Sequence, residues 1–387
     1  MKRVRYICYY DKIGAKKQRG FGLAATAKID YIISVLNNNN IGVDIVSFSK
    51  CIEDDFVFSK GGVSRDGMNT LRLFHSFGGN WLFISRILDR LFVSIQFVVW
   101  FLISVRRNEE IIVYHSLGYS NIFLILKQIK SFSIIGEIEE IYQHVTKNSK
   151  KKGRSEYSFI NVCDKYIFPT LFLNKEIKNN DKPFLIIHGL YQVEEDRKVS
   201  FNDNKIHVVY SGTFDPRKGG AATAASTTAF LPENYHIHIV GFGNKKDTDS
   251  IKETIQNVVS QSKATITFDG LLEKENYIEI LQKCDIGLNT HDPAGAFNDT
   301  SFPSKILTYM ANGLKVLSIR IAAIEQSQIG NHIYYYEKQT PEEIANAIKM
   351  ISEDNNTTDN RSVLNRLDEE FTQELKYFIR SNNQTNI

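Results

Sequence analysis

The chain contains the stretch Phe302-Pro-Ser-Lys-Ile-Leu-Thr-Tyr-Met-Ala-Asn-Gly313, and the apolar run Lys315-Val-Leu-Ser318 follows it directly. A proline near the start and a glycine at the end are typical of a short helix, so these residues predict a helix leading into a strand, as in α/β folds. Ser304 and Lys305 fall in the expected first turn, where free N–H groups and the helix dipole favour an anion. The stretch therefore predicts a phosphate site, with an ordinary helix and a solvated lysine as the alternative.

A second turn of the same kind stands earlier in the chain, in His207-Val-Val-Tyr-Ser-Gly-Thr-Phe-Asp-Pro-Arg-Lys-Gly-Gly220. An apolar strand is expected to run into Gly212, and Lys218 with its flanking glycines precedes an Ala-rich helix over 221–230. Glycines let a backbone approach a ligand closely, and cations before a helix N-terminus favour phosphate. A tight turn with surface cations is the alternative, but two such turns favour the ligand.

The segment Tyr210-Ser-Gly-Thr-Phe-Asp-Pro-Arg-Lys-Gly219 resembles the glycine, six-on-lysine, glycine motif of retaining GT-B glycosyltransferases, family 4 (glycosyl transferases group 1) in particular. The alternation of strands and helices that follows agrees with that family. The resemblance is specific over about 208–318 and extends to earlier residues only in organisation. It implies an α/β chain with two Rossmann-like, doubly wound parallel-sheet lobes, a cleft between them and a C-terminal helix crossing back onto the first lobe.

The resemblance also implies roles by position. Lys218 and Lys305 would be catalytic, because they would stabilise the charge that develops on the departing diphosphate. Gly270 and Leu271 would lie against the nucleotide base. The donor-binding set is Gly212, Thr213, Lys218, Gly243, Gly270, Leu271, Ser304, Lys305 and Thr308.

Three threonines depart from the family pattern. Thr213 stands where most members have arginine, and Thr300 and Thr308 stand where most have two glutamates. Thr308 would give the donor ribose only a neutral, weaker hydrogen bond. Lys305 would compensate for the missing arginine. An altered donor or a chain that has lost catalysis also fits these departures.

The N-terminal half begins like a Rossmann unit, with a strand over 4–10, a helix over 23–36 and a strand over 41–47. Gly20 and Gly22 precede the helix and are predicted to approach a phosphate or sugar. Lys16, Lys17 and Arg19 either meet an anionic acceptor or a membrane surface, or belong to a solvated loop.

Acceptor-side chemistry is expected where the strands Ile111–Ser116 and Ser133–Glu140 end, because ligands bind beyond the carboxyl ends of parallel strands. The resemblance puts Glu139 near the reacting sugar, with Glu137 on the same side of the strand and His115 as its rival. A carboxylate there would stabilise an oxocarbenium-like transition state or receive a proton. A solvated charge cluster is the alternative. His188, at the expected domain crossing, completes the acceptor-side set, with a structural histidine as the alternative. Glu156, which is expected to open a helix, is a weaker candidate for the carboxylate.

The most apolar part of the chain is Trp81–Val105, and its uninterrupted core from Leu91 is shorter than the ~20 residues that span a bilayer. Basic residues bracket it. A buried helix of the N-terminal domain is the favoured interpretation. The alternative is a helix at the membrane interface that brings the enzyme to a lipid-linked acceptor. The bracketing residues are Arg86, Arg90, Arg106 and Arg107.

Composition sets outer limits. The 387 residues, 42% of them hydrophobic, suffice for two cores, and we expect domains over 1–185 and 186–360 with the crossing helix in 361–387. A net charge of +3 does not favour a nucleic-acid partner. Four scattered cysteines indicate neither disulfides nor zinc. With no apparent signal peptide, we expect a cytoplasmic protein, peripheral at the inner face of the plasma membrane if the apolar helix is interfacial.

The predicted function is sugar transfer, with retention, from a nucleotide-diphosphate donor to a glycan or lipid-linked saccharide in bacterial surface polysaccharide synthesis. No cofactor and no metal are expected, because two lysines and a helix end would replace a divalent cation; Asp292 and Asp299 lie in a loop expected near the donor sugar. An inactive scaffold in polysaccharide assembly is the alternative. A nicotinamide enzyme is disfavoured, since no Gly-x-Gly-x-x-Gly joins a strand to a helix.

Overall fold

The computed structural model describes residues 2–11, 19–79, 83–145, 150–177, 181–215, 220–293, 295, 298, 300–355 and 359–380. The chain forms two compact units: unit 1 comprises residues 1–188 and 370–387, and unit 2 comprises 189–369. The predictions for Lys16, Lys17, Trp81, Lys218 and Asp299 lie outside the described residues.

Unit 1 is built on an eight-stranded sheet. All neighbouring strands pair in parallel except the edge strand β4, which is antiparallel to β5. The order of the strands reverses between β1 and β7, which makes the sheet doubly wound. The strands in spatial order are β10 (Phe184–Ile186), β9 (Lys165–Phe168), β8 (Ser133–Glu137), β7 (Glu110–Tyr114), β1 (Lys2–Cys8), β2 (Ile41–Ser47), β5 (Asn69–Leu73) and β4 (Gly62–Asp66); a separate pair joins β3 (Phe58–Ser59) and β6 (Ser76–Phe77).

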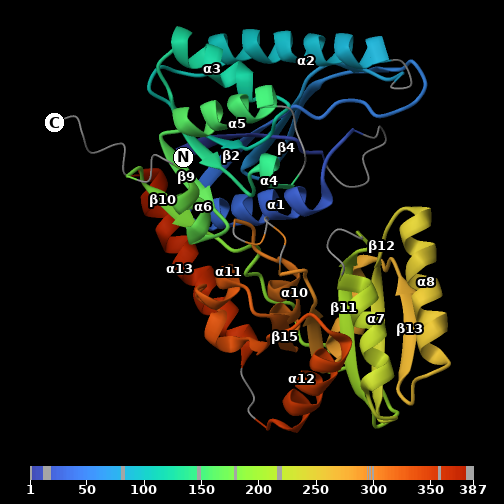
Figure 1. Ribbon diagram of the computed structural model, residues 1–387. Helices are drawn as coiled ribbons and strands as arrows, with labels where there is room; N and C mark the ends of the chain where they lie inside the picture. Colours follow the sequence, from blue (N-terminus) through green and yellow to red (C-terminus); the bar gives the residue numbers. More distant parts are fainter. Residues whose placement is uncertain are drawn as a thin grey trace. The chain divides into compact units, whose positions relative to one another are not determined.

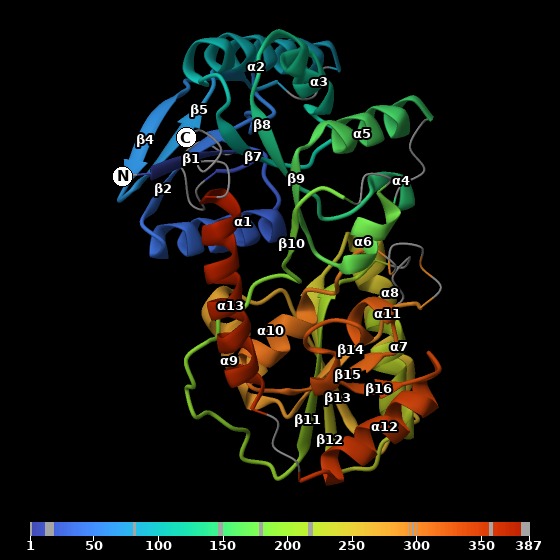
Figure 2. The ribbon, with the colours of Figure 1, turned by 90° about the vertical axis from the view of Figure 1, so that its left-hand side faces the viewer.

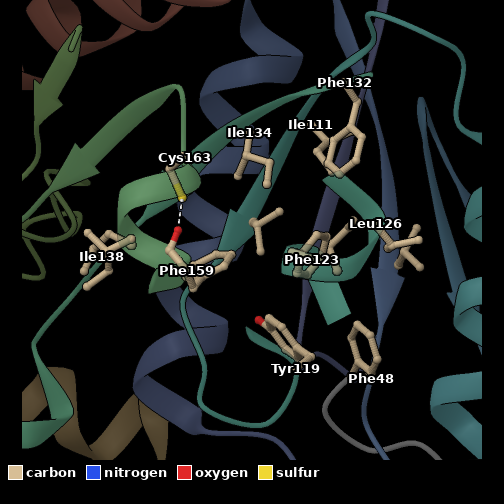
Figure 3. Close-up of a cluster of buried hydrophobic side chains, with 14 of the residues drawn as sticks. Phe48, Ile111, Tyr119, Phe123, Leu126, Phe132, Ile134, Ile138, Phe159 and Cys163 are labelled. Carbon is tan, nitrogen blue, oxygen red and sulfur yellow. Dashed lines mark hydrogen bonds between the residues drawn. The ribbon is translucent and has the colours of Figure 1, made fainter. Parts of the chain in front are cut away.

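Helices cover both faces of this sheet, which is why its central strands are apolar on both sides. In Figure 1, α2 (Phe83–Ser104), α3 (Ser120–Ile129) and α5 (Lys150–Val162) lie on one side, and α1 (Leu23–Asn38) lies on the other. Phe123 and Phe159 meet Ile111 and Ile134 of the sheet in the core between them (Figure 3). Each such buried side chain contributes about 1.5–3 kcal/mol. Two shorter helices are α4 (Tyr142–Val145) and α6 (Leu171–Glu176).

The last helix, α13 (Asn360–Arg380), begins in unit 2 and ends in unit 1, as expected for the C-terminal crossing helix. In its second half, Phe371 stacks on Tyr31 with ring centroids 6.1 Å apart. The amide of Asn39 donates to the Thr372 carbonyl at 2.9 Å. These contacts make the end of the chain part of unit 1.

Unit 2 has a six-stranded sheet whose strands all pair in parallel. Its order reverses between β11 and β14, so this sheet is doubly wound too. The α/β fold class with two doubly wound sheets is therefore confirmed. The strands in spatial order are β13 (Thr265–Gly270), β12 (Tyr235–Phe242), β11 (Ile206–Thr213), β14 (Ile286–Asn289), β15 (Lys315–Ile319) and β16 (Tyr334–Tyr336); the helices are α7 (Gly220–Thr227), α8 (Lys245–Val259), α9 (Lys274–Lys283), α10 (Lys305–Ala311), α11 (Ala322–Glu325) and α12 (Pro341–Glu353).

Two predicted helix starts are wrong. The helix expected from Pro303 begins at Lys305 as α10, because the Pro303 carbonyl accepts only a turn-type hydrogen bond from the Ile306 N–H, at 3.0 Å. Glu156 lies in the middle of α5 and does not open it. Gly153 lies inside that helix and packs against Gln143, since a Cβ there would stand 2.8 Å from the Gln143 amide.

Candidate functional site

Two glycines bring the ends of β11 and β12 together in unit 2. Gly212 and Gly241 are partners in the ladder between these strands. Gly241 has φ +143°, and a Cβ there would lie 1.8 Å from the Gly212 carbonyl oxygen. Only glycine fits at 241, and the carboxyl edge of the sheet is left with bare backbone beside the point where the strand order reverses.

Lys305, the first residue of α10, places its ammonium at this edge. Its Nζ lies 4.0 Å from the ring centroid of Tyr210, in the cation–π range. It also stands 3.1 Å from where a Gly212 Cβ would be, so the absence of a side chain at Gly212 leaves room for it. The lysine thus holds a positive charge at the switch point, where doubly wound sheets bind phosphates.

Two tyrosine hydroxyl groups, one of them on α10 itself, form hydrogen bonds with the strand β11. The Tyr309 hydroxyl accepts a hydrogen bond from the Ser211 N–H at 2.8 Å and donates to the Leu288 carbonyl at 3.3 Å, so one phenol joins β11 to β14. The Tyr277 hydroxyl lies 2.9 Å from the Ser211 Oγ. Burial raises the pKa of Tyr309, which keeps it a hydrogen-bond donor. These supporting tyrosines were not predicted; Tyr309 lies four residues after Lys305, one helical turn away.

The other predicted donor residues follow the same edge, because the carboxyl ends of parallel strands meet there. Gly243 packs so closely on Phe214 that a Cβ would stand 2.9 Å from it. Gly270 ends β13 with φ +68°, and Leu271 after it is 72% exposed. Thr213 ends β11 with its side chain exposed, and so is Ser304 before α10. Their contact with a donor stays a prediction.

The two threonines at the expected glutamate positions differ in exposure. Thr308 donates from Oγ1 to the Ser304 carbonyl at 3.4 Å, a bond within its own helix turn. Thr300 is buried, with 3% of its surface exposed. Neither position supplies a carboxylate.

In unit 1, Glu137 is the last residue of β8 and is fully buried. Its Oε2 accepts a hydrogen bond from the Tyr6 hydroxyl on β1, whereas its Oε1 has no hydrogen-bond partner among the described residues. Burial, reinforced by the charge of Glu139, raises the pKa of Glu137 to about 8. Glu137 is therefore a neutral acid at pH 7, and the alternative of a solvated charge cluster is wrong for this residue.

Glu139 lies beyond the end of β8, so the prediction that Glu137 and Glu139 share one side of a strand is wrong: the ladder ends at Glu137. The Glu139 carboxylate instead meets Lys28 of α1, with Nζ 2.5 Å from Oε1. Lys28 also donates to the Ile187 carbonyl at 3.3 Å. Lys28 was not predicted, although a lone lysine four residues before Ile32, on the buried side of an apolar helix, is a readable signal.

The two predicted histidines are buried and uncharged at neutral pH. His188 places Nδ1 2.8 Å from the Pro169 carbonyl, and burial, together with the charge of Lys28, lowers the pKa of His188 to about 4. His115 stacks on Phe159 with ring centroids 5.8 Å apart, and burial lowers its pKa to about 4. Its Nε2 stands 3.5 Å from the carboxylate of Glu156. His188 thus lies close to Lys28, whereas His115 belongs to the hydrophobic core of unit 1.

The residues before α1 are tied to the protein itself. Gly20 donates its N–H to the Lys50 carbonyl at 2.9 Å, and Gly22 is the extended residue that caps α1. Arg19 is 3% exposed and donates to the Ser49 carbonyl at 2.9 Å and to the Ser59 Oγ at 3.0 Å. The prediction that Arg19 meets an anion, a membrane or solvent is wrong, because its guanidinium is used inside unit 1.

Residues 205–354 match the family model described as glycosyl transferases group 1. No curated protein matches the chain. Among solved structures, the chain is similar to a sucrose-phosphate synthase from Thermosynechococcus elongatus, with a TM-score of 0.71, 14% identity and 100% of both chains covered. It is also similar to the lipopolysaccharide outer core galactosyltransferase WaaB, with a TM-score of 0.62, 15% identity and 98% and 99% of the two chains covered.

A further similar structure is Anabaena Alr3699/HepE in complex with UDP, with a TM-score of 0.61, 12% identity and 98% and 100% of the two chains covered. At such identities the likeness shows the fold, which is GT-B. The fold and the domain at 205–354 define the class of this chain: it is an enzyme of the glycosyltransferase class.

Proposed function

We propose that the chain transfers a sugar from a nucleoside-diphosphate donor, and that Lys305 holds the diphosphate. The observation that carries this proposal is the Lys305 ammonium, 4.0 Å from the Tyr210 ring and beside the bare backbone of Gly212 at the strand-order reversal. A domain of glycosyl transferases group 1 surrounds that position, and HepE, which shares the fold, was solved with UDP.

Lys305 would act on the leaving group. Charge accumulates on the diphosphate as the bond between its oxygen and the anomeric carbon of the sugar breaks, and a preplaced ammonium stabilises that charge without a metal ion. Lys218, which precedes α7 in the sequence, would add a second charge. The transferred sugar would keep its anomeric configuration, as the resemblance to family 4 implies.

Two carboxyl groups of unit 1 have different surroundings, which suits them to different tasks. Glu137 holds a proton at pH 7, with its pKa raised to about 8 by burial and by the charge of Glu139. Glu139 is paired with Lys28 and is 26% exposed, so its carboxylate can receive the proton of an acceptor hydroxyl. The catalytic role would therefore fall to Glu139, with Glu137 positioning the turn that carries it.

The acceptor we propose is a growing bacterial surface glycan, carried on a lipid, and the place of reaction is the cytoplasm. Support comes from WaaB, whose name describes transfer to the outer core of lipopolysaccharide. No cofactor enters this proposal.

Thermal stabilisation in EDTA by UDP, GDP, ADP, dTDP, CMP and NAD tests the donor site. One nucleoside diphosphate should raise the melting temperature, and Lys305→Met should weaken its binding by roughly 1.5–3 kcal/mol, the size of one charge-assisted contact. Lys263→Met is the matched control, because Lys263 is exposed and lies just before the amino end of β13. Equal binding by parent and Lys305→Met would refute the assignment.

An inactive scaffold is the second candidate, and the observation that favours it is the lack of a carboxylate at Thr300 and Thr308. Release of the nucleotide from its sugar donor separates the two. Turnover that falls in Glu139→Gln while donor binding persists supports the enzyme, and nucleotide binding without turnover supports the scaffold.

A further inference from the structure

One face of α2 is apolar and exposed along its whole length. Exposed fractions are 69% for Ile84, 60% for Leu88, 54% for Leu91, 62% for Ile95 and 51% for Val99. These positions recur every three or four residues, so they lie on one side of the helix. We call this surface the α2 face: Ile84, Leu88, Leu91, Ile95, Val99 and Leu102.

The opposite side of α2 is fixed to unit 1. Val93, Phe97 and Phe101 are buried in the core, at most 1% exposed. Asp89 accepts hydrogen bonds from the Phe77 N–H at 2.8 Å and the Ser76 hydroxyl at 3.1 Å. These contacts prevent the helix from turning its exposed side inward. The prediction of a helix buried as a whole is therefore wrong. Because the sequence is apolar on both sides of the helix, it does not indicate which side the rest of unit 1 covers.

The helix α3, which lies beside α2 in both views (Figures 1 and 2), also exposes apolar side chains. Ile125 and Ile129 of α3 are 58% and 60% exposed. Lys130, just after α3, donates to the Leu102 carbonyl at 2.7 Å and so joins the end of α3 to the end of α2. The exposed area is therefore wider than one helix.

The charged residues around the C-terminal end of the α2 face are mainly basic. Asp89 is the only acidic residue of α2, and it points inward with 1% exposure. Arg106 and Arg107 follow the helix and are exposed, and Lys130 adjoins them. The carboxylate of Glu109 forms an ion pair with Arg5. At the N-terminal end Arg86 and Arg90 are exposed, and Arg90 donates to the Gly118 carbonyl at 2.8 Å.

We propose that the α2 face binds the surface of a bilayer that contains anionic lipid. The apolar side chains would enter the boundary between headgroups and acyl chains, which interfacial helices reach by about 5–10 Å, while the basic residues meet lipid phosphates. By length and apolar composition α2 is the single described helix that qualifies as a membrane span. Its core contacts through Phe97 and Phe101 place it on the membrane and not across it.

This proposal does not rest on sugar transfer, because it concerns a surface of unit 1 and needs no donor. The test is flotation of the full chain with phosphatidylcholine vesicles and with vesicles containing phosphatidylglycerol. We expect binding to the anionic vesicles, at least tenfold weaker in Ile95→Glu and weakened severalfold in Arg106→Glu/Arg107→Glu. Met350→Glu is the control, since Met350 is 73% exposed on α12 of unit 2.

A second readout reports depth. In a Trp81→Phe/Trp100→Phe background, the fluorescence of Val99→Trp should be quenched by brominated lipid, whereas that of Met350→Trp should not. Failure of the parent to float with anionic vesicles would overturn the proposal. So would a dimer in sedimentation that Ile95→Glu dissociates, because a second copy would then cover the face. Equal binding to neutral vesicles would overturn the role of the basic residues.

Discussion

Lys28 and Glu139 form an ion pair of 2.5 Å in which the lysine side chain is 6% exposed and the glutamate side chain 26% exposed. The two charges are thus unequally solvated. A buried charge without a partner costs more than a half-solvated one, because water can reach the latter. The pair therefore holds the turn after β8 to α1 mainly by satisfying Lys28.

Removing the two partners should have unequal effects. We expect Glu139→Ala, which leaves Lys28 buried with only the Ile187 carbonyl, to lower the free energy of unfolding by about 3 kcal/mol. Lys28→Met, which keeps the apolar stem, should lower it by about 1–2 kcal/mol. Urea denaturation followed by circular dichroism measures both. A larger loss in Lys28→Met would show that the glutamate is the less solvated partner.

Glu137 predicts a pH dependence. Its folded pKa of about 8 lies above its unfolded value, so the folded state holds a proton that the unfolded state releases, and stability is lost as the pH rises through 8. Between pH 7 and pH 9 the loss should be about 1–2 kcal/mol. Glu137→Gln keeps a neutral side chain and should show little change over this interval. The readout is the urea midpoint at each pH, and equal slopes for parent and variant would contradict the assignment.

Gly241→Ala should destabilise unit 2 by about 2–4 kcal/mol, because the new methyl group would meet the Gly212 carbonyl and φ +143° disfavours a side chain. Gly62→Ala is the matched control: nothing lies within 4 Å of a Cβ there. Thermal unfolding of both variants checks this, and similar melting temperatures would mean that the two strand ends can move apart.

Tyr309→Phe should lower the free energy of unfolding by about 1–3 kcal/mol, because it leaves the buried Ser211 N–H without its acceptor. Nucleotide binding should weaken as well, since Tyr309 holds the helix that begins at Lys305. Tyr377→Phe, at a side chain 66% exposed, should change neither quantity. Calorimetric titration of the nucleoside diphosphate identified above, together with thermal unfolding, measures both effects.

The sequence predicted unit 2 better than unit 1, for a physical reason. Gly212, Gly241 and Lys305 lie where strands end or helices begin, so local chemistry and order along the chain specify them, and Gly212 and Lys305 do meet. The Glu137 site depends on Tyr6 and Lys28, more than a hundred residues away in sequence, and the length of β8 could not be deduced from its own residues. The side of α2 that faces solvent was equally hidden, because both sides are apolar.

Helix α13 has a consequence for how the protein is made. Residues 370–380 complete unit 1 but are translated after all of unit 2, so Tyr31 and Asn39 cannot contact Phe371 and Thr372 until unit 2 has been synthesised. During synthesis, unit 2 can form its sheet before residues 370–380 have covered the part of unit 1 around Tyr31 and Asn39. Early release of a truncated polypeptide would therefore yield a folded second half and a first half that chaperones and proteases recognise.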